Sequence, residues 1–310
     1  MKPVRIGISS CLLGEEVRFD GGHKRNPFLA DTLGPHVEWV RVCPEVELGL
    51  GVPRETLRLV RVGGDVRMIT TRTNVDHTDA MRAWARRRAD ALASMDLRGY
   101  VLKKDSPSCG MEHVKVYGRE GAVSRTGIGL FAEALKTRFP TLPIEEEGRL
   151  GDPALRESFI ERVFAYQRLR DFFETRWTHR TLTEFHAKHE LSLLAHSTKA
   201  FEQLGRFVSR GRHLPRPQLE REYEARFMAA LASPATRKRH MTVLRHIARH
   251  LKKNLDPPSR SGLLLCIEEY RSGLVPLVVP LRLLRHHVFA CRIDALMGQV
   301  YLEAQRVPGV

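Results

Sequence analysis

The chain has 310 residues, of which 42% are hydrophobic and 28% are charged, as is ordinary for a soluble protein with a core in each of two domains. No apolar run reaches about 18 residues, and the apolar stretch near the N-terminus soon meets Glu15 and Glu16, which argues against a membrane-spanning helix and a signal peptide. We therefore expect a cytoplasmic protein with no membrane partner, and the net charge of +15 favours a polyanionic partner.

The first half of the chain alternates short β-rich runs with helical sequence. We predict strands at "PVRIGIS" (3–9), "VEWVRVC" (37–43), "DVRMITT" (65–71) and "LRGYVLKK" (97–104). Apolar residues at helical spacing predict a helix over 76–95. This strand–helix–strand alternation indicates an α/β domain with a parallel sheet.

Three of the five cysteines, Cys11, Cys43 and Cys109, fall just past the C-terminal ends of predicted strands, beside Ser, Pro or Gly. Ligands of open parallel sheets bind at that edge, and reduced thiols in a cytosolic protein favour a metal or catalytic role over disulfides. No Cys-x-x-Cys pair, common in structural zinc sites, is present. Three ligands from three loops suit a cubane iron–sulfur cluster with one open iron, but three unrelated buried thiols explain the residues equally well.

A cluster of Pro and Gly around an acidic run, over residues 140–153, predicts a domain boundary. Asp152 and Pro153 then match an N-cap and the first position of a helix. Thr181 and Glu184 have the spacing of a capping box and predict a second helix start.

Further helices are predicted over 219–232 and 235–255. The apolar stretch 274–288 is interrupted by prolines, and we expect it to pack inside the helical bundle. The predicted organisation is an α/β domain over residues 1–148, followed by an all-α domain over residues 155–310.

The helical half carries most of the positive charge. Residues 151–310 contain 27 Lys and Arg against 16 Asp and Glu, whereas residues 1–150 contain 24 against 20. This bias favours nucleic acid as a partner over an anionic membrane surface, although a solubilising surface is the simpler alternative. Structured RNA is bound largely through phosphates, and the basic residues assigned to it are Arg237, Lys238, Arg245, Arg249, Lys252 and Lys253.

The histidines of the helical half lack a strong zinc motif such as His-Glu-x-x-His. We therefore expect surface or phosphate-facing roles for His186, His189, His196, His240, His246 and His250. Cys266 and Cys291 lie in apolar helical sequence and are expected to be buried packing residues.

The three cysteine-containing blocks, "SSCLLGEEVRFDGGHKRN", "VCPEVELGLGVPR" and "KKDSPSCG", together resemble the family first catalogued as domain of unknown function 523, which includes the thiouracil desulfidases. "FHAKHELSLLAHS" and "YRSGLVPLVVPLRLLRHHV" resemble domain of unknown function 1722. The fused arrangement is similar to that of the tRNA 4-thiouridine desulfidases.

The resemblance implies that Cys11, Cys43 and Cys109 hold a four-iron four-sulfur cluster whose fourth iron takes the sulfur of the substrate. It also implies an essential Glu at Glu45, which would act as a general base on the attacking water in a non-redox reaction.

The essential Ser of the family best matches Ser106, with Ser108 as the weaker candidate. A substrate-binding position falls on His23, where desulfidases for the free base can carry Ser. Phe19 stands in "FDGG" where the family has Tyr.

We therefore expect an enzyme that converts 4-thiouridine in tRNA to uridine, with the helical domain binding the RNA and no protein partner. The thiolated base would have to leave its stack to reach the site. Two alternatives are a non-catalytic iron–sulfur protein that binds RNA or acts as a sensor, and a desulfidase for free thiouracil.

Overall fold

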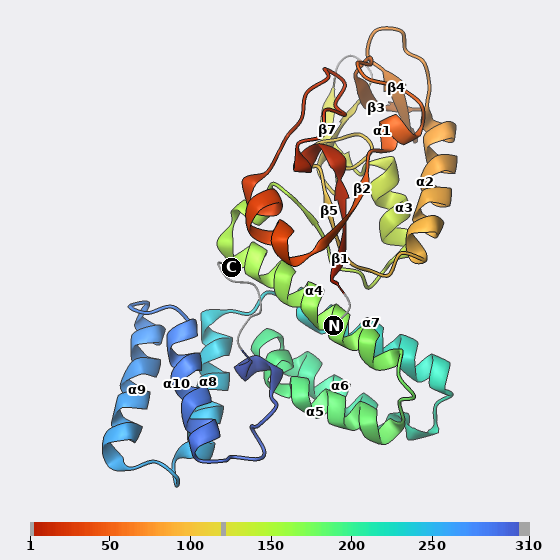
Figure 1. The fold of residues 1–310 in the computed structure, drawn as a ribbon. Helices are drawn as coiled ribbons and strands as arrows, with labels where there is room; N and C mark the ends of the chain where they lie inside the picture. The colour runs from red at the N-terminus through yellow and green to blue at the C-terminus, as the bar shows by residue number, and fades with distance from the viewer. Residues whose placement is uncertain (1–2, 119–121, 304–310) are drawn as a thin grey trace. The chain divides into compact units, whose positions relative to one another are not determined.

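The protein is described by a computed structural model that covers residues 3–118 and 122–303. Two compact units divide the described chain within helix α4 (Pro153–Phe173) (Figure 1). Unit 1 extends to Gln167, and unit 2 begins at Arg168.

Unit 1 contains a four-stranded sheet of order β2-β1-β5-β8. β1 pairs with β2 and with β5, and β5 pairs with β8, all in parallel, so the predicted parallel sheet is confirmed. β5 is buried along its whole length, as expected for an inner strand of a sheet that is covered on both faces. The strands are β1 (Arg5–Ser9), β2 (Glu38–Val42), β5 (Leu97–Leu102) and β8 (Ile144–Glu146).

Glycine allows the two inner strands to accommodate a large ring between them. Gly7 on β1 is paired with Tyr100 on β5, and a Cβ atom at Gly7 would lie 2.2 Å from the Tyr100 ring. The ring therefore occupies the space that any larger residue at position 7 would need.

Helices cover both faces of this sheet. Successive strand residues point to opposite faces. Tyr100 meets Phe131 of α3 (Leu130–Arg138) with ring centroids 5.9 Å apart, whereas its neighbour Gly99 faces Val163 of α4. α2 (Thr78–Ala93) packs beside α3, on the same side of the sheet (Figure 1).

A second sheet of order β4-β3-β6-β7 completes unit 1. β3 and β4 form an antiparallel hairpin whose turn contains Gly63 and Gly64 at φ values of +58° and +99°. The sequence correctly predicts β4 as a strand, but it lies in this second sheet and not in the parallel one. The strands are β3 (Leu57–Val62), β4 (Asp65–Thr70), β6 (Val114–Tyr117) and β7 (Val123–Gly127).

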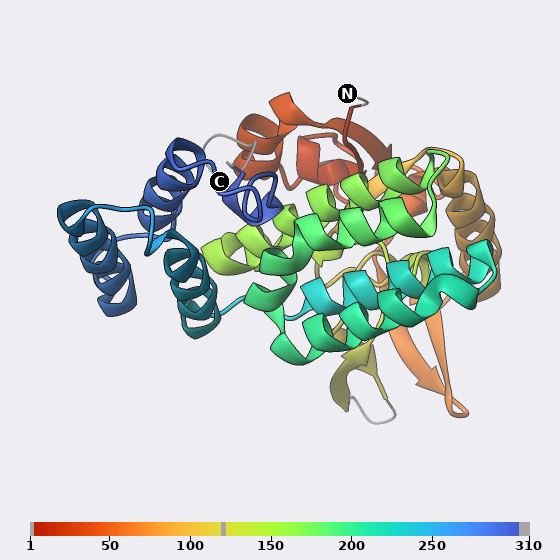
Figure 2. The same ribbon diagram turned by 90° about the horizontal axis from the view of Figure 1, so that it is seen from below.

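Within the described residues, the regular elements of unit 2 are all helices, as predicted. α5, α6 and α7 lie alongside one another, and α8, α9 and α10 form a second group (Figure 2). The helices are α5 (His179–His196), α6 (Thr198–Arg210), α7 (Arg216–Ala232), α8 (Arg237–Leu251), α9 (Pro257–Ser272) and α10 (Val278–Ala290).

Short segments connect these elements. They are α1 (Pro44–Glu47), η1 (Ser10–Leu13), η2 (Phe28–Leu33), η3 (Gly34–His36), η5 (Arg149–Gly151), η6 (Gly211–His213) and η7 (Val300–Leu302). Within residues 3–118 and 122–303, the helices are all too short or too polar to cross a membrane.

One predicted helix start is confirmed and the other is wrong by one turn. Asp152 caps α4 by accepting hydrogen bonds from the backbone amides of Ala154 and Leu155, at 2.8 and 3.1 Å. α5 is instead capped by Thr178, which forms a capping box with Thr181. Both threonines suit an N-cap by residue type, so the sequence alone did not separate them.

The stretch 274–288 is only partly internal, which corrects the sequence prediction. Leu284 and Val288 of α10 are fully buried, but Leu274 is 78% exposed and Val278 is 49% exposed. The helix begins at Val278 and turns one face to the core, so the apolar residues on its other face meet solvent.

Three histidines of α5 are buried, and the expectation of a surface role for them is wrong. His186, His189 and His196 are 5%, 2% and 1% exposed. Burial lowers the pKa of His186 to about 4 and that of His189 to about 3, so both are neutral at pH 7. Inside the bundle, His189 Nδ1 pairs with the Phe185 carbonyl at 2.8 Å and His186 Nδ1 lies 3.3 Å from the Tyr223 hydroxyl, whereas His186 Nε2 is buried without a hydrogen-bond partner among the described residues.

Candidate functional site

The C-terminal ends of β1, β2 and β5 bring three loops together. Ser9 pairs with Val42 across β1 and β2, so Cys11 and Cys43 follow neighbouring strand ends. The amide of Lys103, directly after β5, donates to Ser9 Oγ at 3.0 Å. This bond ties the start of the Cys109 loop to the end of β1.

The Cys109 loop is folded around Ser106. Ser106 Oγ accepts hydrogen bonds from the amides of Ser108 and Cys109, at 3.3 and 3.1 Å. The first turn of α3 also holds the loop, because the amide of Phe131 donates to the Ser108 carbonyl at 2.9 Å. A Cβ atom at Gly129 would lie 2.5 Å from that carbonyl, so the close approach of helix and loop requires glycine.

Cys11, Cys43 and Cys109 are free thiols, and Cys11 lies near enough to the other two to raise the pKa of each. Burial raises the pKa of Cys11 to about 11 and that of Cys43 to about 12, and it raises the pKa of Cys109 well above the usual value. The negative charge of Glu45 raises all three pKa values further, while Lys103 opposes the rise at Cys11. One carboxylate therefore acts on three thiols that come from three separate loops.

The donor chemistry of this edge suits a soft metal centre. Thiolates select zinc, cuprous copper and iron–sulfur clusters. Among residues 3–118 and 122–303, no three His, Cys, Asp or Glu side chains lie close enough to hold a single metal ion. Three thiols at one sheet edge match this preference in donor type.

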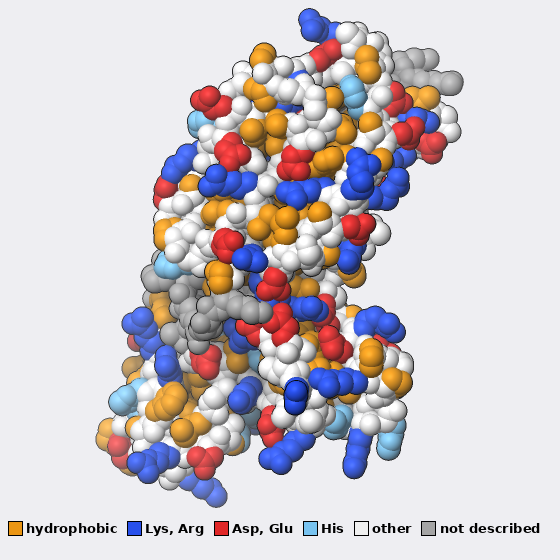
Figure 3. Space-filling view, turned by 45° about the vertical axis from the view of Figure 1, so that its right-hand side comes forward, with side chains coloured by type: hydrophobic (Ala, Val, Ile, Leu, Met, Phe, Trp, Pro, Cys, Tyr) orange, Lys and Arg blue, Asp and Glu red, His pale blue; other side chains and the backbone are white. Residues whose placement is uncertain are grey.

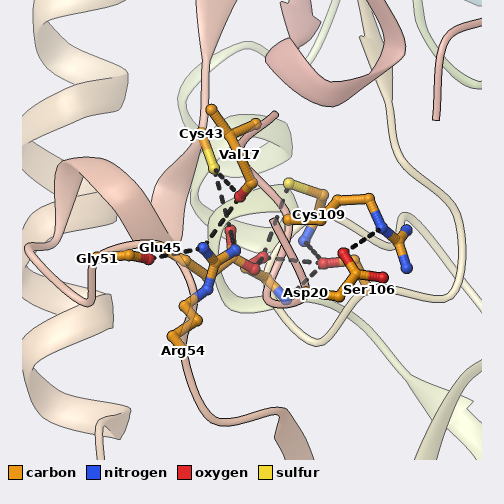
Figure 4. A network of polar contacts seen from close by, with 10 residues as sticks. Val17, Asp20, Cys43, Glu45, Gly51, Arg54, Ser106 and Cys109 are labelled. Carbon is orange, nitrogen blue, oxygen red and sulfur yellow. Dashed lines mark hydrogen bonds and ion pairs between the residues drawn. The ribbon is translucent and has the colours of Figure 1, made fainter. Parts of the chain in front are cut away.

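Glu45 and the two serines form a connected chain beside the thiols (Figure 4). Ser108 Oγ donates to Glu45 Oε1 at 2.5 Å, and Ser106 Oγ lies 2.9 Å from Ser108 Oγ. Since Ser106 already accepts from two amides, its own hydrogen is directed to Ser108. Ser108, the weaker candidate from sequence, thus contacts Glu45 directly, and Ser106 acts through it.

The other Glu45 oxygen faces a thiol and a cation. Glu45 Oε2 lies 3.6 Å from Cys43 Sγ and 3.7 Å from a terminal nitrogen of Arg54. Sequence analysis gave Arg54 no role, although it ends the block "VCPEVELGLGVPR". It also gave no role to Lys103, whose ammonium acts on Cys11 and forms an ion pair with Glu147 at 2.5 Å.

The loop that carries His23 returns to the cysteine edge. The amide of Lys24 donates to the Cys11 carbonyl at 2.9 Å, and exposed His23 accepts from the amide of Arg25 at 3.2 Å. Phe19 on the same loop is 39% exposed. The loop thus carries an exposed imidazole and an exposed aromatic ring, and the substrate-binding role of His23 stays a prediction.

Most of the basic residues assigned to RNA are exposed on unit 2. Lys238, Arg245, Arg249 and Lys252 follow one another at helical spacing, so they share one face along α8 and its C-terminal end. Arg237 differs, because it donates to the Tyr270 carbonyl at 2.9 Å and thereby caps α9. Figure 3 shows Lys and Arg side chains over the visible face of both units. RNA binding by these residues, Lys253 included, stays a prediction.

The remaining two cysteines lie in unit 2. Cys266 is buried on α9, as predicted, whereas Cys291 directly follows α10 and is only half-buried.

Comparisons with known proteins match the two halves separately. A family model described as 2-thiouracil desulfurase matches residues 6–147, and one described as a protein of unknown function (DUF1722) matches residues 191–305.

Two curated bacterial proteins are similar to parts of the chain. The uncharacterized protein YbgA of Escherichia coli (strain K12) is 30% identical over 150 residues, which are 47% of this chain and 88% of YbgA. The uncharacterized protein YbbK of Bacillus subtilis (strain 168) is 30% identical over 136 residues, which are 42% of this chain and 89% of YbbK.

A solved structure is also similar. It is titled a [4Fe-4S]-dependent thiouracil desulfidase, TudS, and is 32% identical in sequence, with a TM-score of 0.40. The match covers 50% of this chain and 98% of that one.

Proposed function

The chain belongs to the 2-thiouracil desulfurase family through residues 6–147, and from this membership we propose that it removes the sulfur of 4-thiouridine in tRNA. The family predicted from the three cysteine blocks is thereby confirmed, as is the DUF1722 region that follows it. The proposal adds a substrate, a cofactor and a set of residue roles to the desulfurase activity that the family name states.

The proposed reaction is a hydrolysis. Water adds its oxygen to the thiocarbonyl carbon at C4, and the carbon–sulfur bond breaks. The oxygen from water becomes the C4 carbonyl oxygen of the uracil ring. The sulfur and two protons depart as hydrogen sulfide. The oxidation states balance, so the reaction needs neither an oxidant nor a reductant.

Cys11, Cys43 and Cys109 would hold a four-iron four-sulfur cluster. Once bound, such a cluster supplies a thiophilic Lewis acid for the sulfur of the substrate. The thiols must lose their protons to act as ligands, and their raised pKa values mean that cluster assembly releases protons.

Glu45 is the proposed general base. Its Oε1 accepts from Ser108, and its Oε2 lies 3.6 Å from the Cys43 thiol, so a water beside that thiol would lie within reach of the carboxylate. General bases of this kind contribute about 10²- to 10⁴-fold to a rate. Ser106 and Ser108 donate in series toward Oε1, so they hold the carboxylate in place.

One observation carries the proposal: the Glu45 carboxylate and three thiols lie at the same edge of the parallel sheet. Glu45 changes the pKa of every one of the three thiols while it contacts Ser108 directly. A purely sensory iron–sulfur site needs the thiols but has no use for a carboxylate and hydroxyl chain beside them.

The positive charge of unit 2 favours tRNA as the substrate, whereas the family description favours a free base. The test incubates anaerobically prepared, cluster-reconstituted protein with tRNA containing 4-thiouridine and, separately, with free 4-thiouracil. Loss of thiouridine with an equal amount of sulfide supports the proposal. Sulfide release from the free base alone would move the assignment to a thiouracil desulfidase, and no sulfide from either would overturn both.

A further inference from the structure

We propose that Arg54 is a positioning residue that fixes the Glu45 carboxylate and the loop from Val17 to Gly22 beside the cysteine edge. This inference rests on the proposed function, since it assigns Arg54 a role in placing the general base. It concerns a side chain that does not itself touch the reacting atoms.

The guanidinium of Arg54 joins three segments of unit 1 (Figure 4). One terminal nitrogen donates to the carbonyls of Val17 and Gly51, at 2.9 and 3.0 Å. The other lies 3.7 Å from Glu45 Oε2. The side chains of Arg54 and Glu45 are only 9% and 12% exposed, so solvent screens their interaction weakly.

The contacts of Arg54 with Val17, Gly51 and Glu45 are called the Arg54 clamp below. The Val17 carbonyl connects this clamp to the Cys43 thiol. It accepts from Arg54 and also lies 3.7 Å from Cys43 Sγ. In addition, the backbone amide of Arg54 donates to the Phe19 carbonyl at 2.9 Å. Both the backbone and the side chain of Arg54 thus hold the loop that leads to His23.

The geometry calls for arginine. A planar guanidinium presents five hydrogens in a fixed fork, which allows one side chain to reach two carbonyls and a carboxylate at once. A lysine ammonium supplies the charge but is a compact point, so it cannot span the same three acceptors. Without the fork, Glu45 Oε2 loses its fixed cation, and the carboxylate is free to rotate away from Ser108.

The experiment compares Arg54→Met and Arg54→Lys with a matched control, Arg41→Met. Arg41 lies on β2 and pairs with Glu15 at 3.0 Å, but its side chain is 58% exposed. A fourth variant, Arg54→Ala, tests chemical rescue. Arg54 lines an open hollow of about 490 Å³, and added guanidinium ion is the probe for the position that the variant vacates.

The first measurement uses metal-free protein and needs no activity. Amide hydrogen exchange is followed by mass spectrometry in residues 17–25 and 43–54. We expect exchange in both segments to be about 10-fold faster in Arg54→Met and unchanged in Arg41→Met, because the clamp is what closes the loop. Unchanged exchange in Arg54→Met would overturn the clamp whatever the enzyme does.

The second measurement uses cluster-loaded protein, normalised to bound iron. We expect kcat of Arg54→Met to fall about 10- to 100-fold with little change in KM, as for a displaced catalytic group. Arg54→Lys should recover only part of the loss, and added guanidinium should raise kcat of Arg54→Ala. A loss that disappears after normalisation to iron, with no rescue, would reduce Arg54 to a stabilising residue.

The outcomes separate this inference from the proposed function. If the wild-type protein releases no sulfide from any thiolated uracil, the proposed function fails, while the exchange result still decides whether Arg54 is a clamp. If the wild-type protein is active and Arg54→Met retains full kcat per cluster, only the positioning role fails.

Discussion

The Glu45 carboxylate is held by a hydroxyl on one oxygen and a cation on the other. Ser108 donates to Oε1 at 2.5 Å, while Arg54 lies 3.7 Å from Oε2. A carboxylate with both oxygens engaged has few orientations, which is what a general base needs if it is to meet a water at a defined place.

Replacing Glu45 by Gln keeps the shape of the side chain and removes the base. We expect Glu45→Gln to lower kcat by about 10²- to 10⁴-fold while bound iron per chain stays the same. Sulfide release and iron content, measured on one preparation, check this prediction. Loss of iron in step with activity would mean that Glu45 supports the cluster and not the chemistry.

Alanine substitutions of the two serines should have different effects, because the serines make different contacts. Ser108→Ala removes the direct partner of Glu45, so we expect kcat to fall about 10- to 100-fold. Ser106→Ala leaves that contact in place and removes the acceptor for two loop amides, so we expect a smaller loss of kcat and a free energy of unfolding lower by about 1 kcal/mol. Kinetics and urea unfolding of both variants test the contrast, which equal effects on kcat would contradict.

At the scale of elements, β8 is the strand whose structural role was hardest to predict from the sequence. Its acidic run looks like a surface linker, yet Glu145 and Glu146 are 4% and 7% exposed. Glu146 accepts from the amide of Met111, and Glu147 pairs with Lys103 and accepts from the amide of Lys104. The end of β8 therefore clamps the Cys109 loop at both of its ends.

Breaking one clamp should loosen the loop. Glu147→Gln removes the charge that pairs with Lys103 inside a largely buried site, and we expect the free energy of unfolding to fall by about 1–3 kcal/mol. Glu38→Gln, which breaks the exposed pair with Arg5, is the control and should cost less than about 1 kcal/mol. Equal losses in the two variants would contradict a specific role for β8.

Two buried histidines of helix α5 make the stability of unit 2 depend on pH. Burial lowers the pKa values of His186 and His189 to about 4 and about 3, below the usual 6.5. The unfolded chain therefore binds protons first as pH falls, so stability is fully present above about pH 6.5 and is lost progressively towards pH 3. Tm between pH 7.5 and 4.5 should fall more steeply in the wild type than in a His186→Gln, His189→Gln variant. Parallel curves would contradict this reading.

Strand periodicity and the residues at strand ends were sufficient to predict the parallel sheet and the positions of Cys11, Cys43 and Cys109 on it. Local pattern did not predict the second sheet, because β3 pairs with β6 across more than fifty residues of chain. It also missed Arg54 and Glu147, since charged residues are usually exposed and only their folded contacts identify them as buried clamps.

At the scale of the whole molecule, unit 1 carries the cysteine edge and unit 2 carries most of the excess charge. If the basic face of α8 binds RNA phosphates, the desulfuration of tRNA must weaken with salt, because each bound phosphate releases counterions. With about six phosphates bound, KM for tRNA should rise by about 10³-fold between 50 and 200 mM salt.

Removing basic residues should flatten this dependence. The variant Arg245→Gln, Arg249→Gln, Lys252→Gln should lower the slope of log KM against log salt by about 1 for each phosphate that the protein no longer binds. Arg271→Gln is the control, since Arg271 already pairs with Glu268 at 2.5 Å and should change little. An unchanged slope in the triple variant would exclude this face as the RNA site.

The central claim is hydrolysis of a thiocarbonyl at the cysteine edge, and it is tested most directly by running the reaction in H₂¹⁸O. Cluster-loaded protein acts on tRNA that contains 4-thiouridine, and the digested nucleosides are analysed by mass spectrometry with sulfide measured in parallel. We predict one ¹⁸O atom in each uridine formed and one sulfide released with it, with both absent in Cys109→Ser. Uridine without ¹⁸O, or 4-thiouridine that persists while the cluster is fully bound, would contradict the account.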